Sequence, residues 1–177
     1  ALNDASEVHI NNGATLELRA TNKFLRTSSS AAIIIDGGIL TMSGPANHNK
    51  FGNMTLRNGA VWTTESSAGS WDGENYVIRN NSTITVDGTT STMSAKDGVN
   101  LEGAITFAVA NDNAGSDLLV NTELENAGSL TKTGAGTMEI QKAATYTGAT
   151  TVSAGTLSLT GPGSISNSSV VTVDSGG

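Results

Sequence analysis

The chain contains no cysteine, only two prolines, and few aromatic or charged residues. Without cysteine it can form neither disulfide bonds nor cysteine-based metal sites. Nine Lys and Arg stand against sixteen Asp and Glu, a net charge of −7. This balance argues against nucleic acid as a partner, because phosphate binding needs clustered basic residues. The longest apolar run, residues 31–35, is far shorter than the roughly 20 residues of a membrane-spanning helix.

Threonine, serine, asparagine and glycine dominate the composition and supply 82 of the 177 residues. Low hydrophobicity with high net charge would indicate disorder, but the net charge is modest and β-branched residues are plentiful. Leu, Ile and Val occur in short runs, and no helical periodicity is present. The composition therefore predicts an all-β, repetitive protein without one thick core.

One short pattern recurs along the chain: a turn residue, usually a glycine, a small residue and then an alternating strand. Its copies follow one another at intervals of 21 to 27 residues. This period is typical of a β-solenoid, in which each turn of the coil stacks on the next. The regular interval and the scarcity of proline and aromatic residues favour a solenoid of about seven to eight coils over a β-sandwich. The copies contain Gly13, Gly38, Gly59, Asn81, Gly103, Gly128, Gly155 and Gly176.

Alternation along each strand predicts which side chains face the core, because successive side chains of a strand point to opposite faces. Thr, Ser, Glu and Lys are expected on the outside, and Asn12, Asn58 and Asn80 are expected to stack at one turn position. Trp62, on a strand, is interpreted as wall or core. The predicted inward residues are Leu16, Leu18, Leu40, Met42, Val61, Ile84, Val86, Ile105, Phe107, Met138, Ile140, Leu157 and Leu159.

The segment 128–159 carries a more specific pattern. It reads Gly-Ser-Leu-Thr-Lys-Thr-Gly-Ala-Gly-Thr-Met-Glu-Ile over 128–140, Tyr-Thr-Gly-Ala-Thr-Thr-Val over 146–152, and Ala-Gly-Thr-Leu-Ser-Leu over 154–159. This closely resembles the autotransporter-associated β-strand repeat, also called the passenger-associated transport repeat. Every glycine of the family pattern is present, and Met138 stands where leucine is usual. The spacer 141–145 lacks the family's common Ser-Gly-x-Asn.

The resemblance implies a right-handed, single-stranded parallel β-helix in the secreted passenger of a bacterial autotransporter. The parent protein would then carry an outer-membrane β-barrel outside this chain, and the passenger would lie on the cell surface or outside the cell. We interpret residues 1–177 as one β-helical segment of a longer protein. Residues 1–127 form degenerate coils, 128–159 the recognisable repeat, and 160–177 the start of a further coil.

The best candidate for a ligand site is the stretch around the second tryptophan. A flat aromatic ring with nearby hydrogen-bond acceptors suits a sugar, and a host-cell glycan or surface protein is the expected partner. The alternative is that the tryptophan folds back to cover an exposed side of the coil. The candidate ligand-binding residues are Trp71, Asp72, Glu74, Asn75 and Tyr76.

Enzymatic and metal sites are weaker hypotheses. Glycoside hydrolysis needs two carboxyl groups roughly 5–9 Å apart, and the candidates by register are Asp72 and Glu74 with Asp97, or Asp87 with Glu102. His9 and His48 lack partners at the spacing of a zinc site. The Asp- and Asn-rich turns could hold calcium, but no calcium-binding nonapeptide repeat is present. Lys132, Lys142 and the run 145–151 are interpreted as repeat surface.

The sequence therefore predicts a rigid stalk or adhesin that is not an enzyme, needs no cofactor or metal, and presents loops for cell or glycan contact. A β-helical carbohydrate-active enzyme and an export scaffold without a ligand are the alternatives. Because stacked coils end in unpaired strand edges, end-to-end self-association is also expected.

Overall fold

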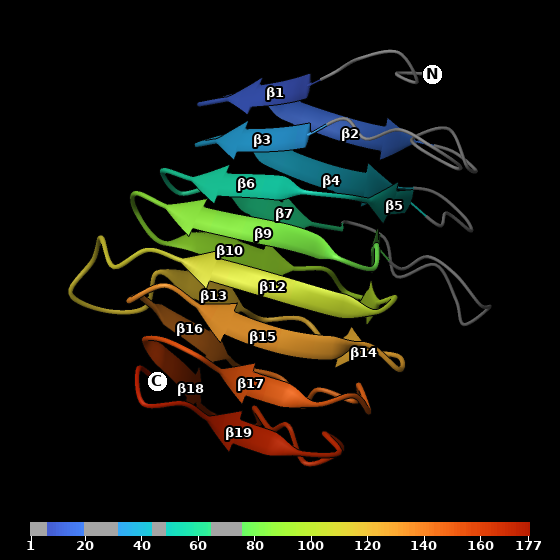
Figure 1. The fold of residues 1–177 in the computed structure, drawn as a ribbon. Coiled ribbons are helices and arrows are strands. Elements are labelled where there is room, and N and C mark those ends of the chain that lie inside the picture. The colour runs from blue at the N-terminus through green and yellow to red at the C-terminus, as the bar shows by residue number, and fades with distance from the viewer. Residues whose placement is uncertain (1–6, 20–31, 44–48, 65–75) are drawn as a thin grey trace.

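The computed structural model describes residues 7–19, 32–43, 49–64 and 76–177. These residues form nineteen strands and contain no helix. The strands lie in three sheets, called here sheets A, B and C, with eight, seven and four strands. Within each sheet the pairs of strands are parallel, and each strand pairs with the corresponding strand of the turns before and after it. The predicted all-β parallel solenoid is therefore confirmed (Figure 1).

The strands of sheet A are, in order, β1 (Glu7–Asn11), β3 (Ala32–Asp36), β6 (Met54–Arg57), β9 (Ser82–Asp87), β12 (Ala104–Val109), β15 (Ser129–Thr133), β17 (Thr150–Val152) and β19 (Val171–Val173). Sheet B contains β2 (Thr15–Arg19), β4 (Ile39–Ser43), β7 (Val61–Thr63), β10 (Ser91–Ser94), β13 (Leu118–Val120), β16 (Thr137–Ile140) and β18 (Thr156–Leu159). Sheet C contains β5 (Asn49–Phe51), β8 (Tyr76–Ile78), β11 (Val99–Leu101) and β14 (Leu124–Glu125).

The coil is right-handed. In Figure 1 the strands of sheet A run leftward in front, and those of sheet B return rightward behind them as the chain descends towards its C-terminus. The solenoid has about six turns, slightly fewer than the seven to eight expected. The seven strands of sheet B, from β2 to β18, enclose six complete turns, and sheet A has one further strand at each end, β1 and β19.

Alternation of apolar and polar residues produces this fold strand by strand. In β9 the residues Ile84 and Val86 are fully buried, whereas Thr83 and Thr85, which alternate with them, face outward. Each of these strands is short, so a single strand buries little apolar surface. The turns become stable only by stacking, because each turn covers the apolar side chains of the turns before and after it.

The recurring pattern of a turn residue, a glycine and a small residue occurs at two different corners of the coil. Gly13, Gly38 and Gly59 lie between a strand of sheet A and the next strand of sheet B, whereas Gly103 and Gly128 lie just before a strand of sheet A. Both corners need a tight turn and use the same residue types, so the pattern changes from one corner to the other without a visible break. The register shows that turns differ in length, because Leu130 pairs with Thr150 but Met54 pairs with Ile84.

The predicted asparagine stack is divided in the same way. Asn12 and Asn58 lie at the corner between sheets A and B, where Asn58 has a positive φ of 54° and donates to Asp36. Asn80 lies at the corner before β9, and its Oδ1 accepts the backbone N–H of Ala104 from the next turn. Asn53 accepts the N–H of Thr83 in the same manner. The asparagines therefore link turns at two corners rather than one.

Most of the predicted inward residues form the core. Eight are buried, namely Leu40, Met42, Ile84, Val86, Ile105, Phe107, Met138 and Ile140. Leu16, Leu18 and Leu157 are partly buried and pack against the core. The prediction for β7 is wrong by one residue, because Trp62 faces inward and Val61 does not. Leu159 is exposed because β18 is the edge strand of sheet B, and no further strand of that sheet covers its inward position.

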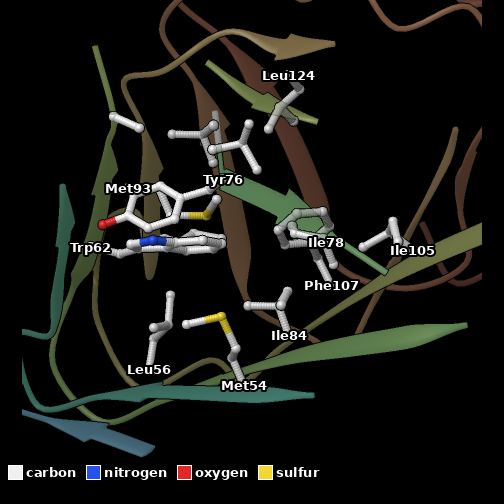
Figure 2. Packing of buried hydrophobic residues seen from close by; sticks show 14 of the residues in the cluster. Met54, Leu56, Trp62, Tyr76, Ile78, Ile84, Met93, Ile105, Phe107 and Leu124 are labelled. Carbon is white, nitrogen blue, oxygen red and sulfur yellow. The ribbon is translucent and has the colours of Figure 1, made fainter. Parts of the chain in front are cut away.

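One part of the core contains three aromatic rings that contact one another. Trp62 of β7 is 1% exposed, and its ring lies 4.9 Å from that of Tyr76 and 5.9 Å from that of Phe51. Figure 2 shows Trp62 and Tyr76 side by side, with Met54 and Leu56 of β6 below them. The interpretation of Trp62 as a core residue is therefore confirmed.

Candidate functional site

The predicted ligand site lies mostly in the part of the chain that is not described. Trp71, Asp72, Glu74 and Asn75 fall outside the described residues. Tyr76 begins β8 and is fully buried, and its hydroxyl donates to the carbonyl oxygen of Thr63 at 2.7 Å. Burial raises the pKa of this phenol. A ring enclosed by Trp62 and Phe51 does not reach a ligand at the surface, so the hypothesis is left with its other four residues.

Two of the carboxylates proposed for catalysis, Asp87 and Glu102, lie far from each other, and each forms an ion pair with a basic residue. Asp87 ends β9 beside Arg57, with its Oδ1 3.4 Å from Nε, whereas Glu102 precedes the neighbouring β12 and pairs with Lys50. The six-residue β9 spans roughly 20 Å at about 3.3 Å per residue. Asp87 and Glu102 therefore lie at opposite ends of two neighbouring strands of sheet A. This separation is too large for the two carboxyl groups of a glycosidase. The other candidate pairs depend on Asp72 and Glu74, outside the described residues.

An acidic group does form at the corner between sheets B and C. Burial disfavours the charged carboxylate of Glu125, and Glu123 and Asp97 are close enough to repel it as well. Together they raise the pKa of Glu125 to about 6. The hydroxyl of Thr145, one turn further on, donates to Glu123 at 2.7 Å. The arrangement joins three successive turns and makes this corner sensitive to pH.

His9 forms no metal site with the other described residues. His9 contacts Glu7 at 3.0 Å on the exposed face of β1, and His48 is outside the described ranges. Across residues 7–19, 32–43, 49–64 and 76–177, no group of three or more His, Asp or Glu side chains is arranged to hold a metal ion. The same residues contain no helix that could cross a membrane.

The Asp- and Asn-rich loop 110–117 is organised by hydrogen bonds from the protein itself. Asp117 is 2% exposed, and its Oδ1 accepts the backbone N–H groups of Asp112 and Asn113. Its Oδ2 accepts the N–H of Thr137 from the following turn at 2.8 Å. Burial raises the pKa of Asp117, but these hydrogen bonds outweigh burial and lower it. The carboxylate is therefore occupied by amide donors.

The outward face of sheet A presents threonine at the same register in successive turns. Thr83 pairs with Thr106, Thr106 with Thr131, Thr131 with Thr151, and Thr151 with Thr172. A second, parallel column contains Thr55, Thr85, Ala108 and Thr133. We call these two columns the threonine face. Neighbouring members of a column lie about 4.8 Å apart, the spacing of strands in a sheet, and none of them is charged.

Within 128–159, glycine allows consecutive corners to stack at very short distances. Gly134 has a φ of +76°, and a Cβ there would lie 2.3 Å from the carbonyl oxygen of Val109 in the previous turn. A Cβ at Gly136 would lie 2.1 Å from the carbonyl oxygen of Ala110. No side chain fits at these distances, so the Gly-x-Gly of the motif is required by contact between turns.

Some motif residues are internal, which corrects the interpretation of Lys132 as repeat surface. In the run 145–151, Tyr146 and Thr150 are buried, whereas Thr145 and Thr147 are exposed as expected. Lys132 is fully buried, and Tyr146 is 1% exposed. The hydroxyl of Tyr146 lies 2.6 Å from that of Thr150, which lies 2.9 Å from that of Ser168 in the next turn. Burial raises the pKa of Tyr146. The buried residues of the motif thus specify contacts between turns.

Sequence comparison agrees with this geometry. The family model of the passenger-associated-transport-repeat matches residues 130–159, which span β15 to β18. No curated protein and no solved structure matches the chain. The match covers the strands and corners in which Lys132, Gly134 and Tyr146 join consecutive turns. Residues 130–159 of this β-solenoid are therefore a passenger-associated-transport-repeat, the repeat that the sequence resembles.

Proposed function

We propose that the chain is part of an exported, autotransporter-type passenger and acts as a rigid β-solenoid stalk that makes adhesive contacts. The observation that carries this proposal is the passenger-associated-transport-repeat at 130–159, whose strands continue sheets A and B without interruption. The repeat family implies export to the cell surface or the extracellular space. A solenoid whose turns are joined by hydrogen bonds at several of the described corners suits a stiff spacer.

Two surfaces are candidates for contact with a host-cell glycan or surface protein. The first is the predicted site with Trp71, Asp72, Glu74 and Asn75. The second is the threonine face, which extends over the turns from β6 to β19. Its uncharged rows of hydroxyl and methyl groups favour an extended, neutral partner, because a charged partner would need charged groups opposite it.

Binding of the folded chain to a panel of glycans and matrix proteins tests this proposal. Trp71→Ala reports on the first surface. Thr106→Lys with Thr131→Lys reports on the threonine face, and Thr92→Lys, an outward threonine of sheet B, is the matched control. Loss of binding in either test variant, with the control unchanged, supports adhesion and identifies the surface. Absence of binding to every member of the panel, with the chain folded by circular dichroism, would reject adhesion and leave an export scaffold.

We place the chain among proteins without catalytic activity. The supporting observation is that Asp87 and Glu102, one of the proposed catalytic pairs, lie at opposite ends of two neighbouring strands of sheet A. Incubation of the chain with acidic polysaccharides, followed by assays for reducing ends and for unsaturated products, tests this assignment. Turnover that is lost in Asp97→Asn would instead support a carbohydrate-active enzyme.

A further inference from the structure

Lys132 carries a positive charge into the interior of the solenoid. Its side chain is fully buried and lies on the inward side of β15, together with that of Leu130. The ammonium group donates to the carbonyl oxygens of Thr133 at 2.9 Å, Gly134 at 2.8 Å and Ala154 at 3.1 Å. A lysine ammonium has three donors, so each of them has an acceptor.

The three acceptors belong to two turns of the coil. Thr133 and Gly134 begin the corner that follows Lys132, whereas Ala154 lies at the same corner one turn later. Other contacts bring these corners together, because Ser153 donates its N–H to the carbonyl oxygen of Lys132 and Thr156 donates to that of Gly136. The buried charge is therefore fully solvated only when the later corner is in place.

The preceding turn contributes a buried negative charge to the same corner. Asp117 accepts the backbone N–H of Thr137, at the far end of the corner whose carbonyl oxygens contact Lys132. Burial lowers the pKa of Lys132, and the charge of Asp117 acts in the opposite direction. A cation on the carbonyl groups and an anion on an N–H group thus hold the corner 133–137 from its two ends.

We propose that Lys132 and Asp117 form a charge latch that makes formation of the corner 133–137 conditional on the turns before and after it. Without the later turn, Lys132 would keep two acceptors and lose Ala154. Without the earlier turn, the lysine would lose its opposite charge. An incompletely bonded buried charge is strongly unfavourable, so the latch couples three turns into one folding unit. This inference does not depend on whether the chain is an adhesin or a scaffold.

Amide hydrogen exchange in Lys132→Met tests the latch, because methionine keeps the length of the side chain and removes its charge. The latch predicts at least a tenfold loss of protection at Ser153 and Thr156, with no change at the distant amide of Glu102. Lys142→Met, in the same repeat, is the control and should leave all three amides unchanged. Protection equal to that of the unsubstituted chain at Ser153 and Thr156 would overturn the latch.

Two further measurements keep the test decisive if Lys132→Met folds poorly. In the unsubstituted chain, Lys132 should resist reductive methylation under conditions that modify Lys142, and equal rates for the two lysines would contradict the proposal. In Asp117→Asn, the pKa of the Lys132 ammonium followed by NMR should fall, because the opposite charge is gone. An unchanged pKa would show that Asp117 does not interact with Lys132, and the latch would then not include the earlier turn.

Discussion

At the scale of single residues, the corners of the coil tolerate little change. Corners of successive turns stack so closely that several glycines lie against the backbone of the turn before them. Charged side chains have a similar constraint, since Lys132 and Asp117 occupy buried positions with their donors and acceptors satisfied by the backbone. We therefore expect the largest effects of substitution at the corners of 128–159, where these features coincide.

Replacing Gly134 by alanine should destabilise the chain by about 2 kcal/mol or more. The new Cβ would meet the carbonyl oxygen of Val109 at 2.3 Å, and the positive φ adds strain. Gly52 is the matched control, because a Cβ there meets nothing within 4 Å. Urea unfolding of both variants measures the difference. Equal midpoints for Gly134→Ala and Gly52→Ala would show that stacking of corners does not limit residue 134.

Stability should depend on the protonation of Glu125. Burial and the charges of Glu123 and Asp97 raise its pKa from 4.5 to about 6, so the folded chain binds this proton more tightly than the unfolded chain does. The contribution of this group is therefore full below pH 4.5 and is lost as the pH rises through 6. Unfolding midpoints measured from pH 4.5 to 7.5 should show this loss, and Glu125→Gln should remove it. A loss of the same size in both proteins would assign it to another group.

At the scale of strands, the two faces of each strand should respond differently to substitution. Phe107→Ala in β12 removes a fully buried ring, which typically costs about 3–5 kcal/mol. Thr106→Ala, the adjacent outward residue, should cost less than about 1 kcal/mol. Thermal unfolding of the two variants compares them directly. A similar loss from both would mean that β12 does not bury one face in the way described.

The strands were largely predictable because alternation encodes their faces. Ile84, Val86, Ile105 and Phe107 were assigned correctly from period-two patterning alone. The same period makes a one-residue error reverse a strand, which is why the predicted inward residues include Val61 although Trp62 is the inward residue of β7. Corners were less predictable, because Asn and Gly serve both types and the turns vary in length.

Lys132 and Tyr76 were assigned by residue type rather than by position. Lys132 shares its side of β15 with Leu130, and Tyr76 shares its side of β8 with Ile78. Alternation therefore indicates that Lys132 faces inward, whereas β8 is apolar and buried throughout and offers no such contrast for Tyr76. What the sequence could not provide is the set of backbone acceptors around Lys132, because these come from separate corners that only the register brings together.

At the scale of the whole molecule, the end of sheet A at β19 exposes apolar residues. Val171 and Val173 pair with the buried Thr150 and Val152, so they occupy inward positions, yet they are 53% and 62% exposed. Strand edges and apolar inward positions together favour stacking on a second copy of the chain. Sedimentation velocity over a range of concentrations should show association that Val171→Lys with Val173→Lys abolishes. Association unchanged by these substitutions would assign the contact to another surface.

The passenger-associated-transport-repeat is one part of a continuous solenoid. Amide hydrogen exchange of the unsubstituted chain, resolved by mass spectrometry, tests this continuity. We predict protection in the strands of all three sheets, from β3 to β17, with the amides of β9 and β12 at least as protected as those of β15 and β16. Protection confined to 128–159, with free exchange in the strands before it, would contradict the account and reduce the solenoid to the repeat alone.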